Sequence, residues 1–106
     1  MKINDIYTAY VSWTQGGKRR PVLIIQENNT DVLVFKITSK YESKSSHIQR
    51  YYYRIMDWKI SGLVKPSYVD TMSRVRLLKD EVSFHYVGRL AVRDRIGLAE
   101  FIENLL

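Results

Sequence analysis

The sequence predicts a mainly β (α+β) domain, a small barrel of short strands followed by a C-terminal α-helix. Two kinds of pattern support this fold class. Residues 5–13 alternate along a β-branched and aromatic stretch, and residues 21–26 form a short apolar run typical of a strand buried on both faces. Residues 93–106 instead carry apolar side chains at helical spacing. Short strands before one terminal helix are typical of a sheet that shares its core with that helix.

The first part of the chain predicts three strands and the segments that connect them. The strand at 5–13, DIYTAYVSW, leads into a polar loop at 14–20. Residues 21–26 then form the buried strand. The segment ENNTD at 27–31 is a turn by its Asn and Asp content, and residues 32–40 pair next in a hairpin.

The middle of the chain is more polar. Residues 41–47, YESKSSH, are serine-rich and without period, which predicts a mobile surface loop. Residues 48–55, IQRYYYRI, resume a strand. Residues 57–62 are expected to form one helical turn, with Asp57 as its N-cap and Gly62 as its stop.

The last part of the chain ends in the helix. Residues 63–78 predict two short strands, interrupted at Pro66 and Asp70. Residues 93–106 form the amphipathic closing helix, and Asp94 stands near its start, where a negative charge is favourable to the helix dipole.

The composition is that of one domain covering residues 1–106, without repeats, linkers or low-complexity segments. Hydrophobic residues make up 45%, and the mean hydropathy is -0.27, as in soluble globular proteins. No cysteine is present, which excludes disulfides, thiolate metal sites and thiol catalysis. The start, MKINDIYTAY, lacks the apolar run of a signal peptide, and no apolar stretch is long enough to span a membrane. We therefore expect a cytoplasmic protein without a membrane partner.

The net charge of +6 favours an anionic partner, either a nucleic acid, an acidic protein or a membrane surface. Residues 1–54 contain nine Lys and Arg against four Asp and Glu, a balance of +5, whereas residues 55–106 contain eight against seven, a balance of +1. An anion-binding face is thus expected mostly in the first half of the chain. The alternative is that the charge serves solubility alone.

The most concentrated basic motif is GGKRRP, in which Lys18, Arg19 and Arg20 follow two glycines. A residue before proline is restricted to extended geometry, so Pro21 should hold the Arg20 backbone at the end of the loop. A guanidinium offers paired donors to phosphate oxygens and keeps its charge at physiological pH. The motif predicts a phosphate clamp, and the competing interpretation is a solvated basic loop.

A second candidate is Thr38 in the segment VFKITSK. Strand alternation places Thr38 on the same face as Lys36, away from Phe35 and Ile37. A hydroxyl beside an ammonium suits a phosphate. An ordinary strand threonine is the other interpretation.

A third candidate is RYYYR, in which Tyr51 and Tyr53 face one way and Tyr52 the other. Tyrosines interleaved with arginines either stack on the bases of single-stranded nucleic acid or pack a barrel. The two histidines, His47 and His85, have no metal-ligand spacing, so neither a metal nor another cofactor is expected.

These features, in this order, resemble the toxins of the MazF/PemK (Kid) family. The shared features are a strand that opens with DIY, a glycine-bearing loop, RRPVLII, a strand that ends in ITSK, GLVKPSYVD, and GRL before the last helix. The resemblance covers nearly the whole chain. It implies a small SH3-like β-barrel of the MazF/CcdB type with a short helix and a C-terminal α-helix.

The resemblance also implies a function. Such toxins are homodimers that cut single-stranded RNA and mRNA at short sequences without a metal, leaving a 2′,3′-cyclic phosphate, and an acidic antitoxin neutralises them. By this resemblance Arg20 and Thr38 match the catalytic arginine and threonine. The expected RNA-binding residues are Lys18, Arg19, Lys36, Ser39, Lys65 and Ser67.

One departure from the family pattern lies in LVKPSYVD. Some relatives use a second basic residue and a nearby carboxylate for proton transfer, and here Lys65 occupies the basic position while Ser67 stands where the acid is expected. Asp70 lies three residues further on and in a regular strand would face the other way. The general base is therefore open, and a barrel that binds nucleic acid or a regulatory protein without cutting is the alternative to the nuclease.

Overall fold

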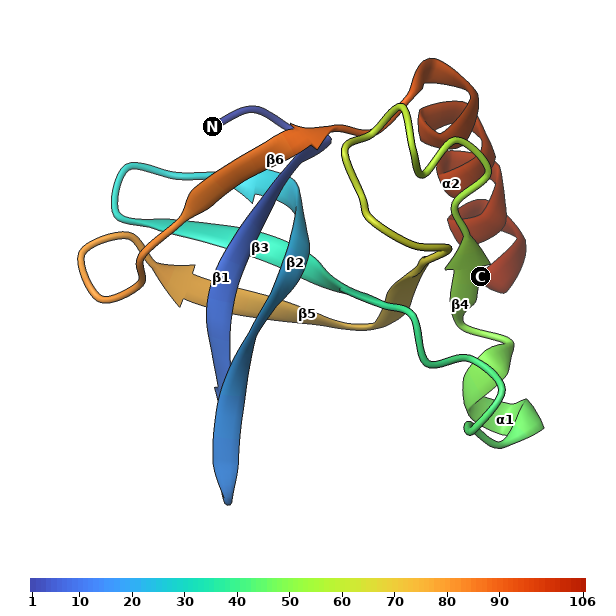
Figure 1. The fold of residues 1–106 in the computed structure, drawn as a ribbon, viewed down its shortest axis with the longest axis horizontal. Coiled ribbons are helices and arrows are strands. Elements are labelled where there is room, and N and C mark those ends of the chain that lie inside the picture. The colour runs from blue at the N-terminus through green and yellow to red at the C-terminus, as the bar shows by residue number, and fades with distance from the viewer.

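Six strands form one antiparallel sheet in the order β4-β5-β3-β2-β1-β6, with a C-terminal helix beside β4 (Figure 1). The computed structural model describes residues 1–106, apart from the side chain of Trp13. The elements in chain order are β1 (Asp5–Trp13), β2 (Gly16–Glu27), β3 (Asp31–Thr38), α1 (Ser46–Gln49), β4 (Tyr52–Arg54), β5 (Tyr68–Leu78), β6 (His85–Arg89) and α2 (Val92–Leu105). The α+β class is confirmed. The sheet is open, because β4 and β6 are its edges.

The sheet bends where its pairing shifts by a residue or more. Shifts occur between Ile6 and Tyr7 on β1, between Ile24 and Gln26 on β2, and after Val34 on β3. Such irregularities bend a strand and increase its twist. The bend lets the sheet curl around apolar side chains instead of lying flat.

Both faces of the curled sheet are buried in its centre. On β2, Leu23 packs into a cluster with Phe35 and with Leu98 of α2, whereas the adjacent Val22 packs into a second cluster with Val34 and other residues of β1, β3 and β5. Consecutive strand residues point to opposite faces, so one strand supplies both clusters. Within the described residues, no helix combines the length and apolar composition that crossing a membrane requires.

Several predicted elements are confirmed. The first strand spans residues 5–13 as predicted, the chain turns before Asp31, and the terminal helix runs from Val92 to Leu105. The turn at 57–62 is also present, since the Ser61 N–H donates to the Asp57 carbonyl at 3.1 Å and Gly62 ends it with a φ of 91°. Its predicted N-cap is wrong: the Asp57 carboxylate instead accepts two hydrogen bonds from Arg93.

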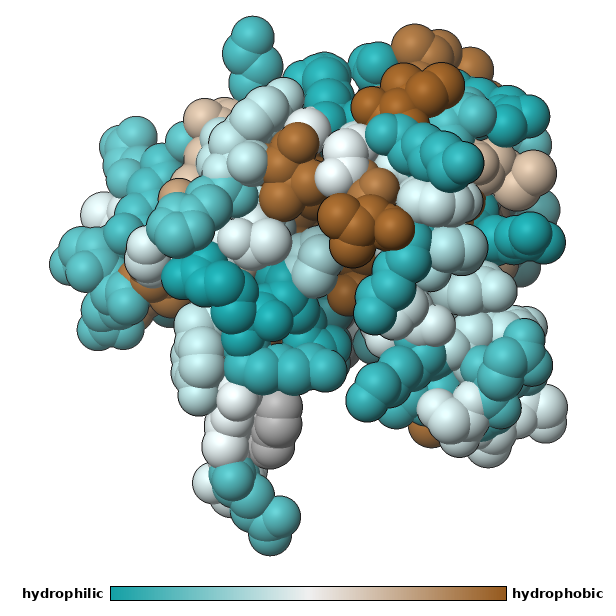
Figure 2. Space-filling view, in the orientation of Figure 1, coloured by the Kyte–Doolittle hydropathy of each residue, from teal (hydrophilic) through white to brown (hydrophobic). Residues whose placement is uncertain are grey.

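The predicted polar loop at 14–20 is wrong. Only Thr14 and Gln15 form the turn, and β2 already begins at Gly16, paired with Trp13. The two strands continue as a hairpin arm beyond the core, and Figure 2 shows this arm projecting from the body of the molecule with hydrophilic residues at its tip. Polar composition there indicates exposure to solvent, while pairing with β1 keeps the backbone extended.

The strand predicted at 48–55 is wrong in its first half. A turn of helix, α1, occupies Ser46–Gln49, and the Ser45 hydroxyl caps it by accepting from the Ile48 N–H at 3.4 Å. Serine is favoured at helix starts because its hydroxyl can accept a hydrogen bond from a backbone N–H of the first turn. Only Tyr52–Arg54 pairs in the sheet.

The two strands predicted at 63–78 are a single strand, β5, that begins after Pro66 and runs through Asp70. Asp70 is tolerated inside the strand because its carboxylate accepts from the Met72 N–H at 2.9 Å and lies 3.9 Å from the Lys36 ammonium. These contacts satisfy a nearly buried charge.

Asp94 connects α2 to the segment that follows β4. Its fully buried carboxylate accepts hydrogen bonds from the Tyr53 hydroxyl at 2.7 Å and from the N–H groups of Met56 and Asp57 at 2.8 Å each. Burial, followed by this bond to Asp94, raises the pKa of Tyr53 well above its usual value. Gly97 leaves room for the contact, because a Cβ there would lie 2.3 Å from the Tyr53 hydroxyl.

We expect Asp94→Asn to lower the free energy of unfolding by about 2–3 kcal/mol, because charge-assisted bonds are lost and the amide nitrogen then faces one of the two backbone N–H groups, whichever way the amide is oriented. Urea unfolding followed by tryptophan fluorescence measures this. Asp80→Asn, at an exposed position, is the matched control. Equal loss in both variants would contradict the role given to Asp94.

Candidate functional site

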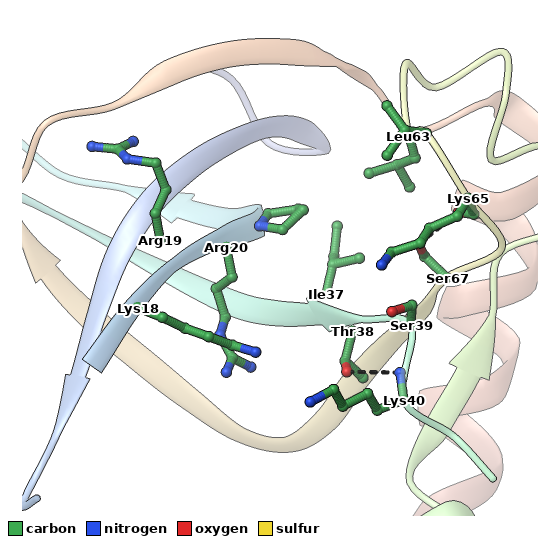
Figure 3. A pocket seen from close by; sticks show the side chains of 12 residues that line it. Lys18, Arg19, Arg20, Ile37, Thr38, Ser39, Lys40, Leu63, Lys65 and Ser67 are labelled. Carbon is green, nitrogen blue, oxygen red and sulfur yellow. Dashed lines mark hydrogen bonds between the residues drawn. The ribbon is translucent and has the colours of Figure 1, made fainter. Parts of the chain in front are cut away.

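A pocket of about 190 Å³ lies where the ends of β2 and β3 meet the segment before β5 (Figure 3). Five basic residues and three hydroxyl residues line it, together with four apolar ones. These are Lys18, Arg19, Arg20, Lys40 and Lys65; Thr38, Ser39 and Ser67; and Pro21, Ile37, Leu63 and Val64. None of the described lining residues is acidic. The pocket is therefore suited to an anion with several oxygens.

The pairing of β2 with β3 brings Arg20 near Thr38. Val22 pairs with Lys36, so extending this register by two residues sets Arg20 opposite Thr38 on the same face of the sheet. The Thr38 hydroxyl accepts from the Lys40 N–H at 3.1 Å, a contact drawn in Figure 3. A hydroxyl that accepts one bond still has its own hydrogen to donate.

The basic side chains in the pocket repel one another. The cationic ends of Lys18, Arg20 and Lys40 lie close together beside Thr38 in Figure 3. The Arg20 guanidinium, followed by the Lys40 ammonium, holds the pKa of Lys18 below its usual value. A bound phosphate would lower this repulsion, because its negative charge attracts each of the three cations.

Arg19 borders the pocket, but its guanidinium points away from it (Figure 3). It donates to the Thr8 carbonyl at 3.2 Å, the Thr8 hydroxyl at 3.3 Å and the Ser83 carbonyl at 3.3 Å. Strand alternation explains this placement, since Lys18 and Arg20 share one face of β2 and Arg19 takes the other. Arg19 joins β2 to β1 and to the segment before β6.

Lys36 lies outside the pocket lining, in the ion pair with Asp70. Ser67 is buried, and its hydroxyl donates to the Lys65 carbonyl at 2.8 Å. Ser67 thus shapes the turn that presents Lys65 to the pocket. Of the residues expected to meet RNA, the structure gathers all in the lining except Lys36.

The three consecutive tyrosines have different surroundings. Tyr53 packs against α2 and Tyr52 is buried among other tyrosines. Tyr51 lies edge-on to His47, with its hydroxyl accepting from Arg50 at 3.0 Å. Packing is therefore the role that the structure shows for Tyr52 and Tyr53.

Lys40 is a pocket residue that the sequence interpretation omitted. It stands two residues after Thr38, and in an extended segment that spacing returns a side chain to the same face. The alternation that singled out Thr38 with Lys36 would also have indicated Lys40.

No protein-family model matches this sequence, and a comparison with curated proteins finds no match.

We expect Arg20→Gln to raise the pKa of Lys18, because the largest source of repulsion is removed. The titration of the lysine side chains by NMR measures this pKa. Lys2→Gln is the matched control, since it removes one positive charge at the exposed N-terminal segment, away from the pocket. An unchanged Lys18 pKa in Arg20→Gln would contradict the cluster described above.

Proposed function

We propose that this chain is a metal-independent endoribonuclease of the MazF/PemK type, a toxin that cuts single-stranded RNA at a short sequence. The observation that carries the proposal is the gathering of cations and hydroxyls around Arg20 and Thr38, with no carboxylate among the described lining residues. A phosphodiester in this pocket meets donors on several sides. The order of motifs along the chain supports the same assignment.

In the proposed reaction the RNA supplies its own nucleophile. The 2′-oxygen forms a bond to phosphorus, the bond from phosphorus to the 5′-oxygen breaks, and the products are a 2′,3′-cyclic phosphate and a 5′-hydroxyl. The 2′-hydroxyl loses its proton to a base and the leaving oxygen gains one. Arg20 binds the non-bridging oxygens as negative charge develops on them, and Thr38 donates a hydrogen bond to one of them.

Lys18 is suited to supply the proton for the leaving 5′-oxygen. Its lowered pKa, caused first by Arg20, makes the ammonium a better acid than an isolated lysine. Lys40 and Lys65 then hold the flanking phosphates of the strand, since both line the pocket.

The proposal extends to fold family, assembly and partner. The curled antiparallel sheet with its C-terminal helix supports an SH3-like barrel of the MazF/CcdB type. We propose a cytoplasmic homodimer that an acidic antitoxin neutralises by competing with RNA for the basic pocket. Attraction between opposite charges makes such a complex weaker as salt rises.

A non-catalytic binding module is the second candidate. It is favoured by Ser67, whose hydroxyl donates to the Lys65 carbonyl at the position where some toxins of the MazF/PemK family have an acid. Such a module would bind phosphate groups without transferring a proton to or from the RNA.

Purified protein, mixed-sequence RNA and EDTA test the proposal, with fragment ends mapped. We expect cuts at one short sequence and cyclic phosphate ends, with the rate reduced about 100- to 1000-fold in Arg20→Ala, as when one oxyanion donor is removed. Thr38→Val should lower the rate in the same direction, because it keeps the shape and removes the hydroxyl.

Lys2→Gln is the control for net charge in this assay and should cut like the wild type. Undiminished cutting by Arg20→Ala would overturn the role of Arg20. Intact RNA that the wild type nonetheless retards on a gel would identify the binding module instead.

A further inference from the structure

Three tyrosines from separate segments gather next to the pocket. Tyr41 follows β3, Tyr52 is on β4 and Tyr68 opens β5. The rings of Tyr41 and Tyr68 are stacked, with centroids 4.5 Å apart and planes 11° from parallel. Tyr52 lies beside both, 6.3 Å from Tyr41 and 6.5 Å from Tyr68. The cluster thus consists of a stacked pair, Tyr41 and Tyr68, and the tilted ring of Tyr52 beside it.

The stacked pair of Tyr41 and Tyr68 adjoins the pocket at Thr38. Tyr68 is the cross-strand partner of Thr38, so their side chains lie side by side on one face of the sheet. Tyr41 follows Thr38 by three residues, and the intervening Lys40 lines the pocket. A ligand held at Thr38 is therefore next to the tyrosines.

The pair combines exposure with rigid support. Tyr52 is 8% exposed, whereas Tyr41 and Tyr68 are half-buried and keep part of their ring surface in solvent. The Tyr41 carbonyl accepts from the Gln49 side-chain amide at 2.8 Å and from the Lys44 N–H at 3.0 Å, which anchors the segment after β3. Because the segment that carries Tyr41 is already held in place, it loses little conformational entropy when the ring binds a ligand.

Cations flank the pair. Arg54 is the cross-strand partner of Tyr68 on the side opposite Thr38, and its side chain is exposed. Lys40 and Lys44 are exposed on either side of Tyr41 in the chain. Positive charge thus continues from the Arg20 pocket past the rings, as in surfaces that follow a nucleic-acid backbone while aromatic rings stack on its bases.

We propose that Tyr41 and Tyr68 form a stacking subsite for the RNA base that adjoins the phosphate held by Arg20 and Thr38. The inference rests on the proposed function and adds a substrate contact to it. Stacking accepts any base, so the subsite contributes affinity and alignment, and hydrogen bonds elsewhere select the sequence.

The test uses the full chain and a short RNA that carries the mapped cleavage sequence, with 2′-deoxyribose at the cut nucleotide so that it stays intact. A second strand lacks the base on one side of that phosphate, and a third lacks the base on the other side. Binding is measured by fluorescence anisotropy at one fixed salt concentration. We expect the wild type to bind one abasic strand about 5- to 150-fold more weakly than the intact strand, the range for loss of one stacked base.

In Tyr41→Ala this difference should shrink toward onefold, and in Tyr41→Trp it should persist. Tyr86→Leu, at an exposed position on the edge strand β6, is the matched control and should behave as the wild type. Because each protein is compared on intact and abasic strands, a general loss of folding or of backbone affinity cancels. Fluorescence of 2-aminopurine in place of the stacked base should be quenched by the wild type and by Tyr41→Trp, and not by Tyr41→Ala.

Equal binding of intact and abasic strands by a wild type that still cuts RNA would overturn the stacking subsite and leave the proposed function standing. An abasic effect of the same size in Tyr41→Ala would also overturn it. If the wild type cuts no RNA, so that no cleavage sequence can be mapped, the proposed function fails, and the subsite fails with it.

Discussion

The pairing of β2 with both β1 and β3 is the constraint on which the rest of the structure depends. It occupies the centre of the sheet, so its register decides which side chains enter each of the two apolar clusters. The same register sends Lys18 and Arg20 to one face and Arg19 to the other. A slip of one residue would exchange these faces, and the pocket and the core would be lost together. Burial of Val22 and Leu23 thus enforces the position of the basic residues beside Thr38.

The electrostatics of the pocket depend on where the carboxylates are held. Four ion pairs lie outside the pocket and connect strands, loops and α2 to one another: Asp5 with Arg89, Glu27 with Lys79, Asp31 with Arg76, and Asp57 with Arg93. Asp70 pairs with Lys36, which is not a lining residue. None of these acids lines the pocket, and there the repulsion from Arg20 and Lys40 lowers the pKa of Lys18. An anionic strand that moves along the pocket and the adjoining tyrosines would meet attraction throughout its path.

Asp94 has two roles, of which the sequence indicates only the first. Its position in the first turn of the helix agrees with the dipole argument made from the sequence. The structure adds that the carboxylate is fully buried and binds Tyr53 and two backbone N–H groups from a segment far away in the chain. This contact attaches α2 to the segment that leads from β4 to the pocket. Asp94 thus stabilises the start of α2 and also holds the segment that leads to the pocket.

The sequence by itself determined the α+β class, the first strand, the terminal helix, the basic first half and the candidates Arg20 and Thr38, because periodicity, charge and the residue before a proline are local properties. Only the tertiary structure decided that Lys36 pairs with Asp70 outside the pocket, that Arg19 turns away, and that Tyr41 stacks on Tyr68. These outcomes depend on strand register, on bulges and on pairing between residues far apart in the chain. Long-range pairing is settled by burial of the whole core, and no window of neighbouring residues contains that information.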